Sequence, residues 1–270
     1  MTDDRTAAES PATSAAESAA TSLRLVAGST ELLLHTLDGL KPEAVAEPCA
    51  LPGWTRGHLL AHIARNADSL VNLLDGARTG RDIPQYATPE TRDRDIEAGA
   101  ARPLDVQLTD VRAAAERFVQ AAAALPEEAW SVQVRHRAGY LFSASDIPWK
   151  RLMEVEYHHV DLDTGHTPAH WPEVFAVREL RRIAANLDGA EGLPGVRLIA
   201  DDITDRLRIG AGSDGDGDGS GEPGLTVEGP VRALTAWLSG RSDGDGLQVH
   251  RGGVLLSDAR AALPRLPPLA

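Results

Sequence analysis

Two stretches of the sequence contain residues that could bind one metal ion together. One holds His62, and the other, EVEYH, begins at Glu154 and ends at His158. Helical residues four apart differ by roughly 40° around the axis, so Glu154 and His158 would project together, one turn apart. An imidazole from a facing helix would complete a three-ligand site with open coordination positions, as in catalytic zinc sites. The pattern therefore predicts metal-assisted chemistry.

Other residues of the second stretch fit this role less well. His159 would lie roughly 140° around the helix from Glu154, so it cannot share an ion with Glu154 as easily. Glu156 would also point away from the ligand pair and is a poorer candidate for the same reason. Asp161 continues the stripe, where we expect it to orient an imidazole. Spacing alone leaves two alternatives open, because Glu154 and His158 also fit an ordinary surface pair and a single histidine is usually structural.

Two acidic runs and the single cysteine suggest other chemistry but do not support it. The run at 214–219 resembles the opening of a calcium loop, yet its twelfth position is Leu225 where a glutamate belongs. We interpret it as a flexible acidic loop and the run at 243–246 as a turn. Cys49 has no obvious local base, which favours a small buried hydrophobe over a nucleophile.

The composition restricts the class of partner. A formal net charge of -13 argues against nucleic acid or an anionic membrane surface, which require a basic face. No apolar run approaches the roughly 20 residues of a membrane span, and one cysteine excludes an internal disulfide. The N-terminal residues lack the pattern of a secretory signal. We therefore expect a cytoplasmic protein that binds a small molecule, with no nucleic-acid or membrane partner.

Four long amphipathic segments precede residue 166, which predicts a four-helix bundle, a fold that commonly places metal ligands in its core. We expect a long connection with some extended structure at 126–145. The predicted helices are 23–40, 55–76 with Thr55 as N-cap, a region from Thr88 that Pro103 interrupts before 104–124, and 147–165. The predicted core residues are Leu25, Leu32, Leu33, Leu37, Leu40, Leu59, Ile63, Leu70, Leu74, Leu152, Val155 and Leu162.

After Pro172 strands and helices mix, which predicts a second, smaller α+β domain. The expected helices are 174–187 and 230–238, and the expected strands are 196–200, 206–209, 225–228 and 247–249. The predicted organisation is a flexible tail at 1–20, a metal-binding four-helix bundle at 21–171 and a small α+β domain at 172–270.

Four blocks of the sequence resemble one known family. They are LPGWTRGHLLAHIARNAD at 51–68, YATPETRDRDIE at 86–97, IPWKRLMEVEYHHVDL at 147–162 and GPVRALTAWLSGR at 229–241. Together they are similar to the mycothiol-dependent maleylpyruvate isomerases, and the similarity covers most of the chain from about residue 20. The resemblance implies a DinB-like four-helix metal-binding domain followed by a small α+β domain resembling sterol carrier proteins.

The resemblance also implies a reaction and a set of residues for it. His62, Glu154 and His158 match zinc ligands, while Arg92 and Arg241 match arginines implicated in activity or thiol binding. The implied reaction is the cis–trans isomerisation of maleylpyruvate to fumarylpyruvate, the step after gentisate ring opening. Zinc, or another divalent metal, would favour mycothiol as the thiolate that adds reversibly to the double bond. We expect a monomer whose partners are maleylpyruvate and mycothiol.

A fold and a metal triad do not fix the substrate, so two alternative functions stay open. One is another mycothiol-dependent reaction, such as S-transfer or detoxification. The other is a non-catalytic protein that binds a metal and senses a thiol or a small acid.

Overall fold

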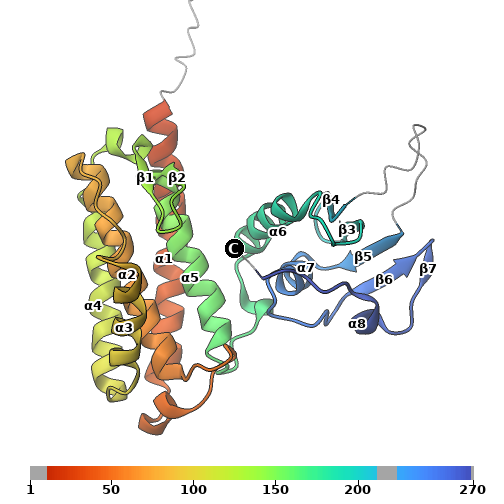
Figure 1. Cartoon of the computed structure of the whole chain (residues 1–270), viewed down its shortest axis with the longest axis horizontal. Coiled ribbons are helices and arrows are strands. Elements are labelled where there is room, and N and C mark those ends of the chain that lie inside the picture. The colour runs from red at the N-terminus through yellow and green to blue at the C-terminus, as the bar shows by residue number, and fades with distance from the viewer. Residues whose placement is uncertain (1–10, 212–223, 269–270) are drawn as a thin grey trace, which may run out of the picture. The chain divides into compact units, whose positions relative to one another are not determined.

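The structure is a computed structural model that describes residues 11–211 and 224–268 of the 270-residue chain. It contains two compact units, Met1–Gly165 and His166–Ala270 (Figure 1). The expected domain boundary after residue 171 stays a prediction. Of the flexible tail predicted at 1–20, residues 11–20 belong to a helix and residues 1–10 lie outside the described residues. The acidic run at 214–219 lies outside the described residues.

The first unit is the expected four-helix bundle. Its long helices are α1 (Pro11–Asp38), α2 (Arg56–Thr79), α4 (Leu104–Ala123) and α5 (Ile147–Asp161), with the shorter α3 (Pro89–Ala100) against α2 (Figure 1). Helix α2 contacts α4 and α5, while α1 contacts α5, so the two helices that carry the predicted ligands, α2 and α5, are neighbours in the bundle. Short 3-10 helices connect the long ones: η1 (Pro42–Ala46), η2 (Glu127–Ser131) and η3 (Ala144–Asp146).

Helix α2 follows the sequence prediction closely. It begins after Thr55, whose hydroxyl accepts a hydrogen bond from the backbone N–H of His58 and caps the helix. It ends at Thr79 and is followed by the C-cap Gly80, whose φ of 69° lies in the left-handed region that glycine adopts without strain. The predicted stripe of Leu59, Ile63, Leu70 and Leu74 is buried, which confirms the face that α2 turns to the core.

Helix α1 differs from the prediction in its start and in its buried face. It begins at Pro11, twelve residues before the expected start, in an alanine-rich stretch that favours helix. Leu33 and Leu37 are buried as predicted, but Leu32 is 45% exposed and its prediction as a core residue is wrong. Two serines, Ser22 and Ser29, occupy the buried stripe instead. Both serine hydroxyls donate hydrogen bonds, which allows them to be buried. A prediction based only on the spacing of apolar residues therefore does not find this buried face.

The connection before α5 forms a small hairpin of β1 (Gln133–Arg135) and β2 (Leu141–Ser143), paired antiparallel with Val134 opposite Phe142. The sequence predicts only some extended structure there. Gly139 in the turn has a φ of 94°, which suits glycine. A short basic segment, residues 135–137, begins at the end of β1 and continues into the turn of this hairpin.

The second unit is the expected small α+β fold. Its five-stranded sheet has the order β4-β3-β5-β6-β7, in which only β3 and β5 pair in parallel. Helices α6 and α7 share a hydrophobic core with the sheet (Figure 1). Strand β7 and helix α8 were not predicted. The elements are η4 (Pro168–His170), α6 (Glu173–Leu187), β3 (Val196–Ala200), β4 (Arg206–Ile209), β5 (Leu225–Gly229), α7 (Val231–Leu238), β6 (Gln248–Arg251), β7 (Val254–Leu255) and α8 (Ala259–Ala262).

Among the helices at 11–211 and 224–268, none combines the length and the apolar character needed to cross a lipid bilayer.

The packing of α2 against α3 generates a stability prediction at Gly57. A Cβ atom there would lie 2.2 Å from the carbonyl oxygen of Ala100 and 3.0 Å from that of Val45. Gly57→Ala should therefore lower the free energy of unfolding by about 2 kcal/mol, measured by urea denaturation.

Gly28 in α1 provides the matched control, because a Cβ atom there meets no atom within 4 Å. Gly28→Ala should raise the free energy of unfolding by about 0.5–1 kcal/mol, since alanine is the better helix former. Equal effects of the two substitutions would contradict the close approach of α2 and α3.

Candidate metal centre

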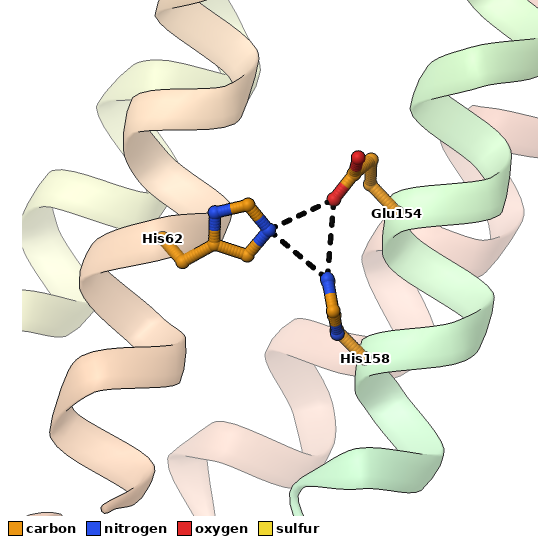
Figure 2. Close-up of side chains that lie close together, drawn as sticks. All are labelled: His62, Glu154 and His158. Carbon is orange, nitrogen blue, oxygen red and sulfur yellow. Dashed lines mark hydrogen bonds and ion pairs between the residues drawn. The ribbon is translucent and has the colours of Figure 1, made fainter. Parts of the chain in front are cut away.

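Three potential ligand atoms meet between α2 and α5 (Figure 2). The Nε2 atom of His62 lies 3.0 Å from Oε2 of Glu154 and 3.0 Å from Nε2 of His158. Oε2 of Glu154 lies 3.2 Å from Nε2 of His158, one turn further along α5. The structure therefore brings together the three residues that the sequence analysis selected as ligands.

The donor set suits a divalent cation. Ligand atoms of a tetrahedral zinc ion with bonds of 2.0–2.1 Å lie about 3.3 Å apart, close to the spacing of the three atoms. Without a cation, the two imidazole nitrogens and the carboxylate oxygen compete for the same protons, because all three present lone pairs to one point. One cation accepts all three lone pairs at once. Imidazole and carboxylate are common zinc ligands.

Two neighbours set the orientation of the imidazoles. The Nδ1 atom of His158 lies 2.9 Å from Oδ2 of the buried Asp161, so a proton on Nδ1 leaves the Nε2 lone pair facing the centre. The ring of His62 packs edge-on against Trp54, with ring centroids 5.6 Å apart. Among the described residues the Nδ1 atom of His62 has no hydrogen-bond partner. Asp161 therefore has the orienting position that its spacing predicted.

The electrostatics of the cluster favour an anionic carboxylate. Burial alone would raise the pKa of Glu154, but hydrogen bonds from His158 and His62 hold it well below its usual value. Burial lowers the pKa of His62. Burial also acts to lower the pKa of His158, yet its hydrogen bonds to Asp161 and Glu154 raise it overall. A cation that binds here would displace a proton from His158, as metal ligands must be deprotonated.

The opposite face of α5 is fixed against α1. The hydroxyl of Ser29 donates a hydrogen bond to the carboxylate of Glu156, and Thr36 Oγ1 lies 2.8 Å from Nε2 of His159. Both α5 side chains are buried on this side. These contacts hold Glu156 and His159 away from the ligand cluster, which explains why neither joins it.

An arginine that the sequence analysis did not select ties α5 to α2. Arg151 is 1% exposed, and its Nη1 atom donates to the carbonyl oxygen of Ile63 and to Oδ1 of Asn66, both at 2.9 Å. Burial lowers the pKa of Arg151 to about 10, which leaves it charged at neutral pH. Ile63, which accepts one of these hydrogen bonds, is the next residue after His62. Arg151 therefore fixes the spacing between α5 and α2 close to the three predicted ligands.

Arg92, the first predicted arginine, lies on α3 and lines a cavity of about 500 Å³ in the first unit. It pairs with Asp93 at 2.6 Å. Burial lowers the pKa of His62, and the positive charge of Arg92 lowers it further. Burial raises the pKa of Tyr86, which lines the cavity and also feels the charge of Glu154. The cavity therefore lies within electrostatic reach of the ligand cluster.

Arg241, the second predicted arginine, belongs to the second unit and follows α7. Its Nη1 atom donates to the carbonyl oxygen of Ser239 at 2.7 Å. Arg241 lies in the second unit and the three predicted ligands lie in the first. Its role in activity or thiol binding stays a prediction. The half-buried Cys49 has a pKa raised by burial, which disfavours a nucleophilic thiolate.

The other polar residues of this cavity were not predicted from the sequence. Its lining includes Gln85, Tyr86 and the basic hairpin residues 135–137. The RHR run at 135–137 was the available signal, because three basic or imidazole side chains in succession are unusual in so acidic a chain. Their position beside α3 depends on the hairpin, which the sequence did not predict.

Comparisons with known proteins agree with the fold. Residues 26–163 match the family model described as the mycothiol maleylpyruvate isomerase N-terminal domain. The crystal structure of a mycothiol-dependent maleylpyruvate isomerase is 26% identical, with a TM-score of 0.81 over 93% of this chain and 97% of that chain. A histidine-to-alanine mutant of such an isomerase gives a TM-score of 0.80 at the same identity and coverage.

A comparison with the curated proteins gives no match. The family model nevertheless covers more than half of the chain, from α1 to the end of α5, and includes all three residues of the ligand cluster. The chain therefore belongs to the family of the mycothiol maleylpyruvate isomerase N-terminal domain, as its sequence blocks predicted.

Proposed function

We propose that this protein is a mycothiol-dependent isomerase that converts maleylpyruvate to fumarylpyruvate. The observation that carries the proposal is the meeting of His62, Glu154 and His158 at one point, in a chain of this family. The similarity to solved isomerases of that name extends over both units, because it covers 93% of the chain. In the cell this activity would serve gentisate degradation, in the cytoplasm.

His62, Glu154 and His158 would hold a zinc ion. Bound zinc would supply a Lewis acid that keeps the mycothiol sulfur as a thiolate at neutral pH. Asp161 keeps the Nε2 lone pair of His158 directed to the centre, and Arg151 keeps α5 against α2. The protein itself needs no nucleophile, which agrees with the raised pKa of Cys49.

The reaction uses mycothiol catalytically. When bound, mycothiol would supply a nucleophilic thiolate that adds reversibly to one carbon of the cis double bond. Addition would leave a carbon–carbon single bond that can rotate, with the displaced electron pair on the conjugated ketone oxygen. Loss of the same thiolate would restore the double bond in the trans product. No oxidant, reductant or net proton is consumed.

Cationic side chains would stabilise the negative charge that forms on the ketone oxygen and the charges of the two carboxylates. Arg92 is suited to this role because it lines the cavity and its positive charge acts on His62, one of the proposed ligands. We assign Arg241 to activity or to binding of mycothiol, on the match of its position to family arginines.

The proposed reaction predicts thiol-dependent turnover. Purified zinc-loaded protein should remove the absorbance of maleylpyruvate in the presence of mycothiol and should leave it unchanged without the thiol. Turnover of only unrelated electrophiles would indicate an S-transferase instead. Metal binding without any turnover would indicate a binding protein.

Removal of the carboxylate ligand should abolish metal retention. Glu154→Ala should weaken zinc binding by more than about 100-fold, because even changes to groups around the ligands typically cost 10–100-fold. Metal content after dialysis, measured by mass spectrometry, tests this. Glu116→Ala changes an exposed carboxylate on α4 and should keep the wild-type zinc content. Full occupancy in Glu154→Ala would refute the ligand assignment.

The hydrogen bond that His158 donates to Asp161 should tune the affinity of the centre. Asp161→Asn keeps an acceptor of similar shape but removes its charge, and should weaken zinc binding about 10-fold in a competition with a chelator. Asp163→Asn is the matched control, since Asp163 is exposed and its positive φ of 53° tolerates asparagine. Equal zinc affinities of the two variants would exclude an orienting role for Asp161.

A further inference from the structure

The cavity that Arg92 lines is basic, although the chain has a formal net charge of -13. Its lining contains three arginines, Arg92, Arg135 and Arg137, against one carboxylate, Asp82. Its volume of about 500 Å³ lies within the range of small-molecule sites. A concave site with excess positive charge in an acidic protein is suited to a small anion.

Arg137 differs from the other two arginines in having no partner for its charge. Arg135 lies 3.6 Å from Asp82 and donates to the carbonyl oxygen of Gly139, while Arg92 pairs with Asp93. Within the described part of the chain, the guanidinium of Arg137 makes no hydrogen bond or ion pair. Its planar fork is therefore available to bind a carboxylate through two parallel hydrogen bonds.

The backbone of Arg137 is fixed to the ligand helix. Its N–H donates to Oε1 of the buried Gln85 at 2.8 Å, and the Nε2 atom of Gln85 donates to the hydroxyl of Ser69 at 3.4 Å. Ser69 lies on α2, two helical turns after His62. The chain of hydrogen bonds therefore sets the position of Arg137 relative to the ligand cluster through one rigid helix.

His136 also lines this cavity and carries no charge there. Its Nδ1 atom accepts a hydrogen bond from the backbone N–H of Ala138 at 3.2 Å, so its proton is on Nε2. The ring stacks on Tyr140, with centroids 4.5 Å apart. Burial and the nearby charge of Lys150 lower the pKa of His136 to about 4, so the ring stays neutral at neutral pH.

We propose that Arg137, together with Arg92, binds the carboxylate at the 2-oxo acid end of the substrate, the end remote from the double bond. This inference rests on the proposed function for the identity of the substrate. It makes the β1–β2 hairpin the element that selects substrates with a second carboxylate at that end. Arg137 then acts in binding, while the ligand cluster serves the reacting carbons.

The test compares two substrates and two arginine variants. The substrates are maleylpyruvate and its analogue with a methyl group in place of the remote carboxylate. Arg137→Gln should raise the KM for maleylpyruvate about 10- to 100-fold with little change in kcat, because a charge-assisted bidentate contact is lost from ground and transition state alike. The KM for the methyl analogue should not change, since it lacks the carboxylate.

Arg94→Gln is the matched control. Arg94 lies on α3 close to Arg92, but its side chain is 71% exposed, pairs with Asp95 and does not line the cavity. This variant should keep the wild-type KM for both substrates. An unchanged KM for maleylpyruvate in Arg137→Gln, or an equal rise for both substrates, would overturn the inference.

A binding measurement separates this inference from the proposed function. Calorimetric titration of wild-type protein and Arg137→Gln with fumarylpyruvate needs no turnover. A 10- to 100-fold weaker affinity in the variant supports the carboxylate site, even if the wild type fails to isomerise maleylpyruvate. Equal affinities, or no binding to the wild type, would overturn it.

Discussion

The rotation of α5 about its own axis is the constraint on which the site depends. This helix carries polar groups on two opposite faces, and each group has its partner on a different neighbour. Glu156 and His159 meet hydroxyls of α1, whereas Arg151 and the ligand pair meet α2. Because a buried polar group without a partner is costly, a turn of α5 by even one residue position would break both sets of contacts.

The same arrangement explains how the bundle can hold three potential ligand atoms close together without another group of the described residues that occupies them. Arg151 and Asp161 lie on either side of the ligands along α5, and both are buried. They hold the helix spacing and the imidazole orientation without using the ligand atoms themselves. A centre built on two rigid helices is thus preorganised, and the loops and hairpin around it remain available to set the choice of substrate.

Much of the site could be predicted from the sequence because it depends on local periodicity. The spacing of Glu154 and His158 placed them on one face, and their placement excluded His159. The contribution of His62 could not follow from periodicity, because His62 and Glu154 are 92 residues apart and meet only when their two helices pack against each other. Residue type suggested that link and the family resemblance supported it, and the structure gives its geometry.

Other features escaped prediction for physical reasons. The buried stripe of α1 includes Ser29, whose burial depends on a carboxylate 127 residues later. The position of Arg137 depends on Gln85 and Ser69, which are far from it in the chain and close only after the hairpin has folded. Hydrophobic pattern reports which face is buried, but it does not report where a polar group finds its partner.

The proposed chemistry depends on one cation held by two imidazoles and one carboxylate, with a position left for a thiol. X-ray absorption at the zinc edge, on zinc-loaded protein with and without mycothiol, tests this most directly. We expect nitrogen and oxygen neighbours only in the absence of the thiol, and one additional sulfur neighbour when mycothiol is present. A zinc spectrum that mycothiol leaves unchanged would contradict it.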